Sequence, residues 1–110
     1  MIHEFRRYRI KVGMASRYVE AFEQALPVIE DHMRLLAFWT SDIGPLSWVS
    51  HLWEFDDLAN RAACYAAMRA DPRYRDEFVP KALPFVEEMH STILDPVSFS
   101  ERLPLMRRRS

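Results

Sequence analysis

Apolar residues recur at helical spacing early in the chain. Four of them fall at i, i+4, i+7 and i+11, which is one face of an α-helix: Tyr18, Phe22, Ala25 and Ile29. This spacing predicts a helix over residues 15–33, with the Ser16 hydroxyl as its N-terminal cap. Pro27 removes one intrahelical hydrogen bond, so we expect it to kink or split this helix.

A second helix is predicted to begin at Asp56 or Asp57 by capping and to run to about residue 70. Its inner face is predicted to carry Leu58, Ala62 and Tyr65. Asp71-Pro72 opens another helical stretch, with the aspartate as the cap and the proline at the first position. Two further prolines should divide residues 72–90 into two short helical segments.

Runs rich in β-branched and aromatic residues predict four strands, over residues 2–12, 34–43, 46–55 and 90–94. Gly44-Pro45 marks a short turn between the second and third strands, which predicts an antiparallel hairpin. The order is therefore β-α-β-β-α-β. This order predicts a ferredoxin-like α+β fold, with a four-stranded antiparallel sheet and the helices on one of its faces.

The third strand, "LSWVSHLWEF", carries large apolar groups on both faces. Trp48 and Leu52 lie on one face, while Val49, His51 and Trp53 lie on the other. Strands that are apolar on both faces are buried on both, but the predicted helices cover only one. We expect a second copy of the chain to cover the open face, giving a homodimeric α/β barrel. We place the face of His51 toward that partner because it is the less hydrophobic of the two.

Length and composition limit the possible functions. A chain of 110 residues is one domain, which we expect to span residues 1–96 and to be followed by a tail over 97–110. The net charge of −1 provides no basic field for nucleic acid. The single cysteine, Cys64, excludes an internal disulfide and a Cys-based metal motif. The N-terminal residues do not resemble a secretory signal, and no apolar run is long enough to span a membrane, so we expect a cytoplasmic protein.

Three stretches of the chain resemble the NIPSNAP family: "HEFRRYRIKVG", "FWTSDIGPLSWVSHLWEFDDLANR" and "ADPRY". The matching positions, in chain order, are Glu4, Arg6, Tyr8, Gly13, Trp39, Gly44, His51, Trp53, Phe55, Arg61, Asp71 and Pro72. The resemblance covers residues 2–96 and implies a dimeric α/β barrel. It implies little about activity, because the family's biochemical roles are poorly defined and a fold does not supply a function.

His51 and Trp53 share a strand face and are candidates for the lining of a binding site. An imidazole titrates near neutral pH, so His51 is the candidate general base of any catalytic site. The alternative is a core histidine whose ring nitrogens are both hydrogen-bonded. Trp39 and Trp53 are candidates to stack on a ligand.

Glu4, Arg6 and Tyr8 share a face of the first strand. Charged groups that face a closed interior must be paired, so a Glu4–Arg6 pair completed by His51 or Arg61 is a candidate anion- or carbonyl-binding patch. The alternative is a structural ion pair. Arg61 is itself a candidate to grip a carboxylate or phosphate, or else to stabilise the local loop or the dimer. The four histidines have no metal-ligand spacing, so we predict no metal and no cofactor.

Two hypotheses about function follow. In the first, a small apolar or aromatic molecule binds in a cavity between the two sheets of the dimer, with or without cofactor-free chemistry. In the second, the barrel is packed solid and the protein is a non-catalytic binding or scaffold protein that acts through its outer helices or tail. The presence of a cavity of a few hundred Å³ separates them.

Overall fold

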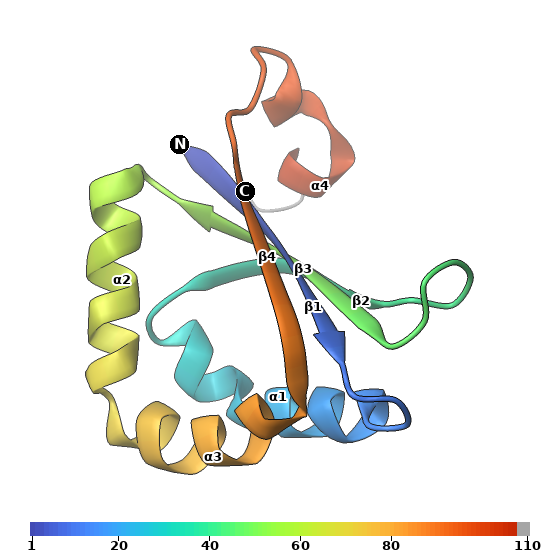
Figure 1. Cartoon of the computed structure of the whole chain (residues 1–110). Helices are drawn as coiled ribbons and strands as arrows, with labels where there is room; N and C mark the ends of the chain where they lie inside the picture. The colour runs from blue at the N-terminus through green and yellow to red at the C-terminus, as the bar shows by residue number, and fades with distance from the viewer. Residues whose placement is uncertain (108–110) are drawn as a thin grey trace.

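The predicted topology is confirmed. The computed structural model describes residues 1–107 and contains one antiparallel sheet in the order β2-β3-β1-β4 (Figure 1). The strands are β1 (Ile2–Ile10), β2 (Arg34–Thr40), β3 (Trp48–Phe55) and β4 (Val86–Leu94). The long helices are α1 (Ala15–Glu30) and α2 (Leu58–Ala70). With helices on one face of this sheet, the chain has the ferredoxin-like α+β fold.

Shorter elements complete the chain. A π-helical segment η1 (Arg73–Phe78), helix α3 (Val79–Ala82) and the 3-10 turn η2 (Leu83–Phe85) connect α2 to β4. After β4 follow the 3-10 turn η3 (Ser100–Arg102) and helix α4 (Pro104–Arg107). No helix within residues 1–107 is long and apolar enough to cross a membrane.

Several boundaries differ from the predictions. Helix α1 begins after Met14 without a side-chain cap, and Ser16 lies inside it. It runs through Pro27 without a break, because the proline falls in the last turn and few hydrogen bonds follow it. Asp57 does cap α2, since its carboxylate accepts a hydrogen bond of 2.7 Å from the backbone N–H of Asn60. Strand β4 is longer than predicted, because pairing with β1 overrides the weak strand propensity of its first residues.

The predicted orientation of the third strand is wrong. Strand β3 pairs with β1 so that His51 lies opposite Arg6, and Trp53 lies opposite Glu4. This face packs against the helices, where Phe22 of α1 contacts both His51 and Trp53. Aromatic residues of the helices pack on this face, so its lower hydrophobicity did not indicate which side of the sheet the helices cover. The face left open by the helices carries Trp48 and Leu52 instead.

An irregularity in β2 changes which of its residues face the helices. The register of β2 against β3 shifts between Leu35 and Ala37. Leu35 and Phe38 consequently both pack against the helix-side core, although strict alternation places them on opposite faces. Trp39 lies on the open face, where its ring contacts Phe5.

The tail lies beside the beginning of β1. Residues of η3 and α4 line a hollow together with His3, which pairs with Glu54 and therefore lies on the open face of the sheet. His3 is buried there and hydrogen-bonds to Glu54 of β3 at 3.1 Å. The tail was predicted over residues 97–110, and residues 108–110 lie outside the described part of the chain. Within residues 97–107, the tail forms two short helical elements next to the domain.

Candidate functional site

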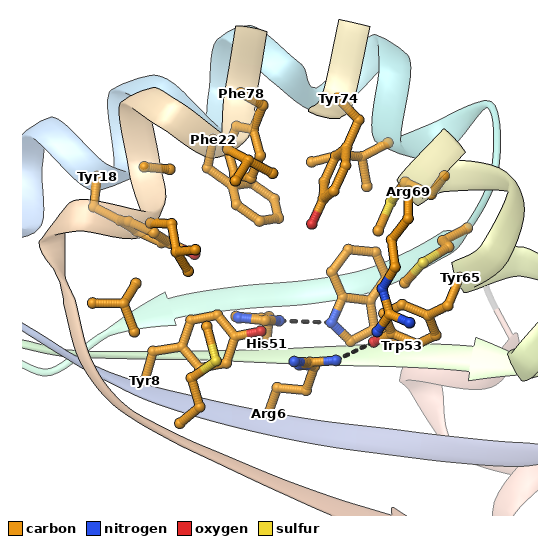
Figure 2. Close-up of a pocket in the computed structure, with 18 residues that line it drawn as sticks. Arg6, Tyr8, Tyr18, Phe22, His51, Trp53, Tyr65, Arg69, Tyr74 and Phe78 are labelled. Atoms are coloured by element: carbon orange, nitrogen blue, oxygen red, sulfur yellow. Dashed lines mark hydrogen bonds between the residues drawn. The ribbon is translucent and has the colours of Figure 1, made fainter. Parts of the chain in front are cut away.

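A cavity of about 290 Å³ lies between the sheet and the helices (Figure 2). The strands provide one wall with Arg6, Tyr8, His51 and Trp53. The helical elements provide the other with Tyr18, Phe22, Tyr65, Arg69, Tyr74 and Phe78. Aliphatic side chains such as Ile29, Met68 and Val86 complete the lining, so the wall is mainly apolar and rich in aromatic rings, with a few polar groups, which is the usual composition of a small-molecule site.

His51 is held in one tautomer by Trp53. The indole Nε1–H of Trp53 donates a hydrogen bond of 2.6 Å to Nδ1 of His51 (Figure 2). An indole nitrogen can only donate, so Nδ1 must be the acceptor and the proton of the neutral imidazole must lie on Nε2. The ring is fixed further by Phe38, which stacks on it at 5.1 Å, and by Tyr8, whose ring meets it edge-on at 4.9 Å.

The Nε2–H of His51 has no hydrogen-bond partner within residues 1–107. The side chain is only 2% exposed, so bulk water does not take the place of the missing partner. Leaving this buried donor unpaired costs free energy. Burial, together with the nearby charge of Arg6, lowers the pKa of His51 to about 3. His51 is thus neutral at pH 7 and offers a donor, which argues against the predicted role as a general base.

Glu4 is the centre of a buried polar network. Arg61 of α2 binds its carboxylate through two hydrogen bonds, of 3.0 and 2.9 Å. The Tyr65 hydroxyl donates to the same carboxylate at 2.9 Å, and the Ser91 hydroxyl of β4 also donates to it. Burial alone would raise the pKa of Glu4, but the hydrogen bonds from Arg61 and Ser91 and the charge of Arg6 outweigh it and lower the pKa. Glu4 is therefore ionised and fully satisfied.

Arg6 lies between this network and the cavity. Its guanidinium donates to the Tyr65 hydroxyl and lies 3.4 Å from the Glu4 carboxylate. The group also stacks near the rings of Tyr8 and Tyr65, at 5.2 and 5.4 Å from their centroids. Its Nε is buried and has no hydrogen-bond partner within the described residues. Arg6 and Tyr65 are the members of the network that line the cavity.

The structure brings together most of the predicted site residues, but not all. Glu4, Arg6, Tyr8, His51, Trp53 and Arg61 gather on the helix side of the sheet. Arg61 completes the Glu4–Arg6 pair as one of the two predicted options, and His51 does not. Trp39 is on the other face of the sheet, 49% exposed, so the expected stacking of one ligand on Trp39 and Trp53 is wrong.

Several cavity residues were missed by sequence reasoning. Tyr74 and Phe78 lie four residues apart, a spacing that places both on one helical face and that could have indicated their role. Arg69 has no such signal, because a single arginine in a helix is usually solvated. These residues were overlooked because the helices were assigned to the face of the sheet opposite His51.

The model of the family described as NIPSNAP matches residues 3–101 of this chain. Protein NipSnap of Drosophila melanogaster is 30% identical over 99 residues, which cover 90% of this chain and 36% of that protein. Protein NipSnap homolog 3B of Mus musculus is 28% identical over 97 residues, which cover 86% of this chain and 39% of that protein. The chain thus spans about two fifths of the length of these curated relatives.

Solved structures agree with this fold. A NIPSNAP family protein with unknown function from Agrobacterium tumefaciens superposes with a TM-score of 0.87 at 33% identity, covering 96% of this chain and 94% of that one. A putative antibiotic biosynthesis monooxygenase from Bordetella bronchiseptica superposes with a TM-score of 0.68 at 13% identity, covering 87% of this chain and 96% of that one. The second likeness is one of fold alone.

Replacing Glu4 by glutamine should destabilise the protein strongly. The change leaves the Arg61 and Arg6 charges without their buried carboxylate, and breaking a buried pair in this way costs about 3 kcal/mol. Urea unfolding followed by circular dichroism measures the loss. The control is Glu88→Gln, which removes a partly exposed carboxylate 3.6 Å from Arg9 and should leave the midpoint nearly unchanged. Equal midpoints for Glu4→Gln and the wild type would contradict the network.

The buried His51 should make stability depend on pH. Its folded pKa of about 3 lies below its ordinary value of 6.5, so the unfolded chain binds the proton more readily. The contribution of the neutral His51 to the free energy of unfolding is complete above pH 6.5 and is lost as the pH falls toward 3. The wild type should therefore lose about 2 kcal/mol more than His51→Gln between pH 6.5 and 4.5, measured by urea unfolding. Parallel curves for the two proteins would show that the histidine is not held neutral.

Proposed function

This chain belongs to the NIPSNAP family, and we propose that it binds a small, largely apolar or aromatic molecule in the cavity between its sheet and its helices. The observation that carries this proposal is the aromatic wall of that cavity, of about 290 Å³, around a buried histidine donor that has no partner within residues 1–107. The volume is close to the lower end of the range for ligand sites, which is about 300 Å³. A molecule the size of a fused two-ring aromatic suits this space.

The site favours binding over proton transfer. A general base needs a free lone pair and a pKa near the working pH, whereas Nδ1 of His51 is occupied by Trp53 and Nε2 carries the proton. The Nε2–H is suited to donate to a carbonyl or hydroxyl oxygen of the ligand. The proposed site lies within one subunit, on the helix side of the sheet, and replaces the expected one between two sheets.

The competing hypothesis is a scaffold protein with a solid core that acts through its outer helices. The cavity supports the ligand hypothesis over this one. The chain covers about two fifths of its curated relatives, so an activity of those longer proteins would not transfer to it directly. A cytoplasmic location and the absence of a nucleic-acid partner stay predictions from the sequence.

A neutral aromatic probe, 2-naphthamide, should bind saturably in the micromolar to millimolar range, as followed by ligand-observed NMR. Leu83→Trp should weaken this binding at least about tenfold, because Leu83 lines the cavity and is exposed enough to accept a larger ring that fills the space. Leu46→Trp is the matched control, since Leu46 is exposed in the loop before β3 and does not line the cavity.

Two results would count against the ligand hypothesis. One is the absence of saturable binding to the folded wild type. The other is equal binding to the wild type and to Leu83→Trp, which would place the probe elsewhere. Either result would favour the scaffold hypothesis.

We also propose that a second copy of this chain covers the open face of the sheet. Phe5, Trp39 and Leu52 form an apolar strip on that face, and 49% of Trp39 is exposed in the single chain. Within residues 1–107, the tail contributes to a hollow beside His3 that none of these three residues lines. A self-complementary surface of this kind is buried by a two-fold dimer, and the family resemblance implies the same assembly.

The dimer should appear as a scattering-derived mass of twice 13.1 kDa. Trp39→Lys should shift the mass toward a single chain, because a charge within the apolar strip is costly to bury. Ile43→Lys is the control, since Ile43 is 92% exposed in the hairpin loop, and it should remain dimeric. A wild-type mass of one chain at micromolar concentration would refute the dimer.

A further inference from the structure

Two guanidinium groups face the same region of the cavity. Arg6 comes from β1 and Arg69 from α2, and both lie over the ring of Tyr65, at 5.4 and 5.1 Å from its centroid. Figure 2 shows the Arg69 side chain reaching down from the helix toward the Tyr65 hydroxyl, beside the hydrogen bond from Arg6. No aspartate or glutamate within residues 1–107 lines this cavity.

One carboxylate, that of Glu4, is too few to neutralise these charges. Glu4 is already bound at both oxygens by Arg61, and its contact with Arg6 is long, at 3.4 Å. Within the described residues, Arg69 forms no ion pair; it lies over the ring of Tyr65, and its charge also acts on the Tyr74 hydroxyl. Glu4 is therefore shared by two guanidinium groups and does not pair with Arg69, which leaves this side of the cavity positively charged.

The charged and ring-nitrogen groups on the cavity wall are all donors. Arg6 and Arg69 can only donate, and the tautomer fixed by Trp53 makes Nε2 of His51 a donor as well. Two of these donors, the Nε of Arg6 and the Nε2 of His51, are buried without partners within residues 1–107. A buried donor without a partner costs free energy, so a ligand rich in acceptor oxygens would be favoured.

We infer that the ligand is an aromatic carboxylate whose carboxylate group lies between Arg6 and Arg69 and whose rings lie among the aromatic side chains of the cavity. This inference rests on the proposed function. A guanidinium fork matches a carboxylate in geometry, and its charge-assisted hydrogen bonds are about twice as strong as neutral ones. A carboxylate is favoured over a phosphate because only two arginines converge here and the rest of the wall is apolar.

The inference is tested by comparing 2-naphthoate with its neutral analogue 2-naphthamide by titration calorimetry at pH 7.5. The wild type should bind 2-naphthoate about tenfold more tightly or better, because only the anion forms charge-assisted hydrogen bonds. Arg69→Met should remove this preference and leave the affinity for 2-naphthamide within about twofold, since methionine keeps the apolar part of the side chain. Arg69 is chosen because it lies outside the Glu4 network, so its loss should not unfold the protein.

Arg75→Met is the matched control. Arg75 is an exposed arginine on η1 that pairs with Asp76 at 2.9 Å and does not line the cavity, so this variant should keep the full preference. Equal affinity of the wild type for the two probes would overturn the anion inference and leave the binding function standing. Tighter binding of 2-naphthyl phosphate than of 2-naphthoate would overturn the choice of a carboxylate. If neither naphthoate nor naphthamide binds, the proposed function fails and this inference with it.

Discussion

A carboxylate without access to water is the constraint on which the arrangement of this protein depends. Glu4 is fully buried on β1, so its charge has to be matched by donors from the elements around it. Arg61 and Tyr65 supply them from α2, and Ser91 supplies one from β4. The carboxylate therefore ties the helix to the sheet and the edge strand to the central strand. One turn after Tyr65, the same helix carries Arg69 to the cavity.

The same network explains why the cavity wall is short of acceptors. Glu4 accepts hydrogen bonds at both oxygens and is turned away from the cavity, which Arg6 faces instead. Trp53 uses the only acceptor nitrogen of His51. What remains toward the interior are the nitrogen donors of Arg6, Arg69 and His51 and the tyrosine hydroxyls, among aromatic and aliphatic side chains. The Nε of Arg6 and the Nε2 of His51 have no hydrogen-bond partner within residues 1–107, which costs folding free energy. Either the other interactions of the fold offset this cost, or a ligand supplies the missing acceptors.

The fold followed from the sequence because its signals are local. The apolar face of α1, the cap at Asp57 and the chain break at Gly44-Pro45 each depend on a few neighbouring residues, although the expected short turn is a loop over residues 41–47. The side of the sheet that the helices cover is different, because it depends on contacts between distant segments. Strand β3 is apolar on both faces, so its pattern is compatible with either choice. The Glu4–Arg6 pair and Arg61 as its possible partner were predicted, whereas the bonds of Glu4 to Tyr65 and Ser91 and that of His51 to Trp53 came only from the structure.

The misplacement of Trp39 has its own physical cause. Strict alternation groups Trp39 with Leu35, but the shift of register between Leu35 and Ala37 changes the parity of every later residue in β2. An edge strand tolerates such an irregularity, since only one neighbour has to adapt. Phe38 is thereby directed to the helix side, where it stacks on His51, and Trp39 is directed to the open face. One irregularity thus completes the packing around the buried imidazole and also places a large apolar ring on the surface proposed for the second copy.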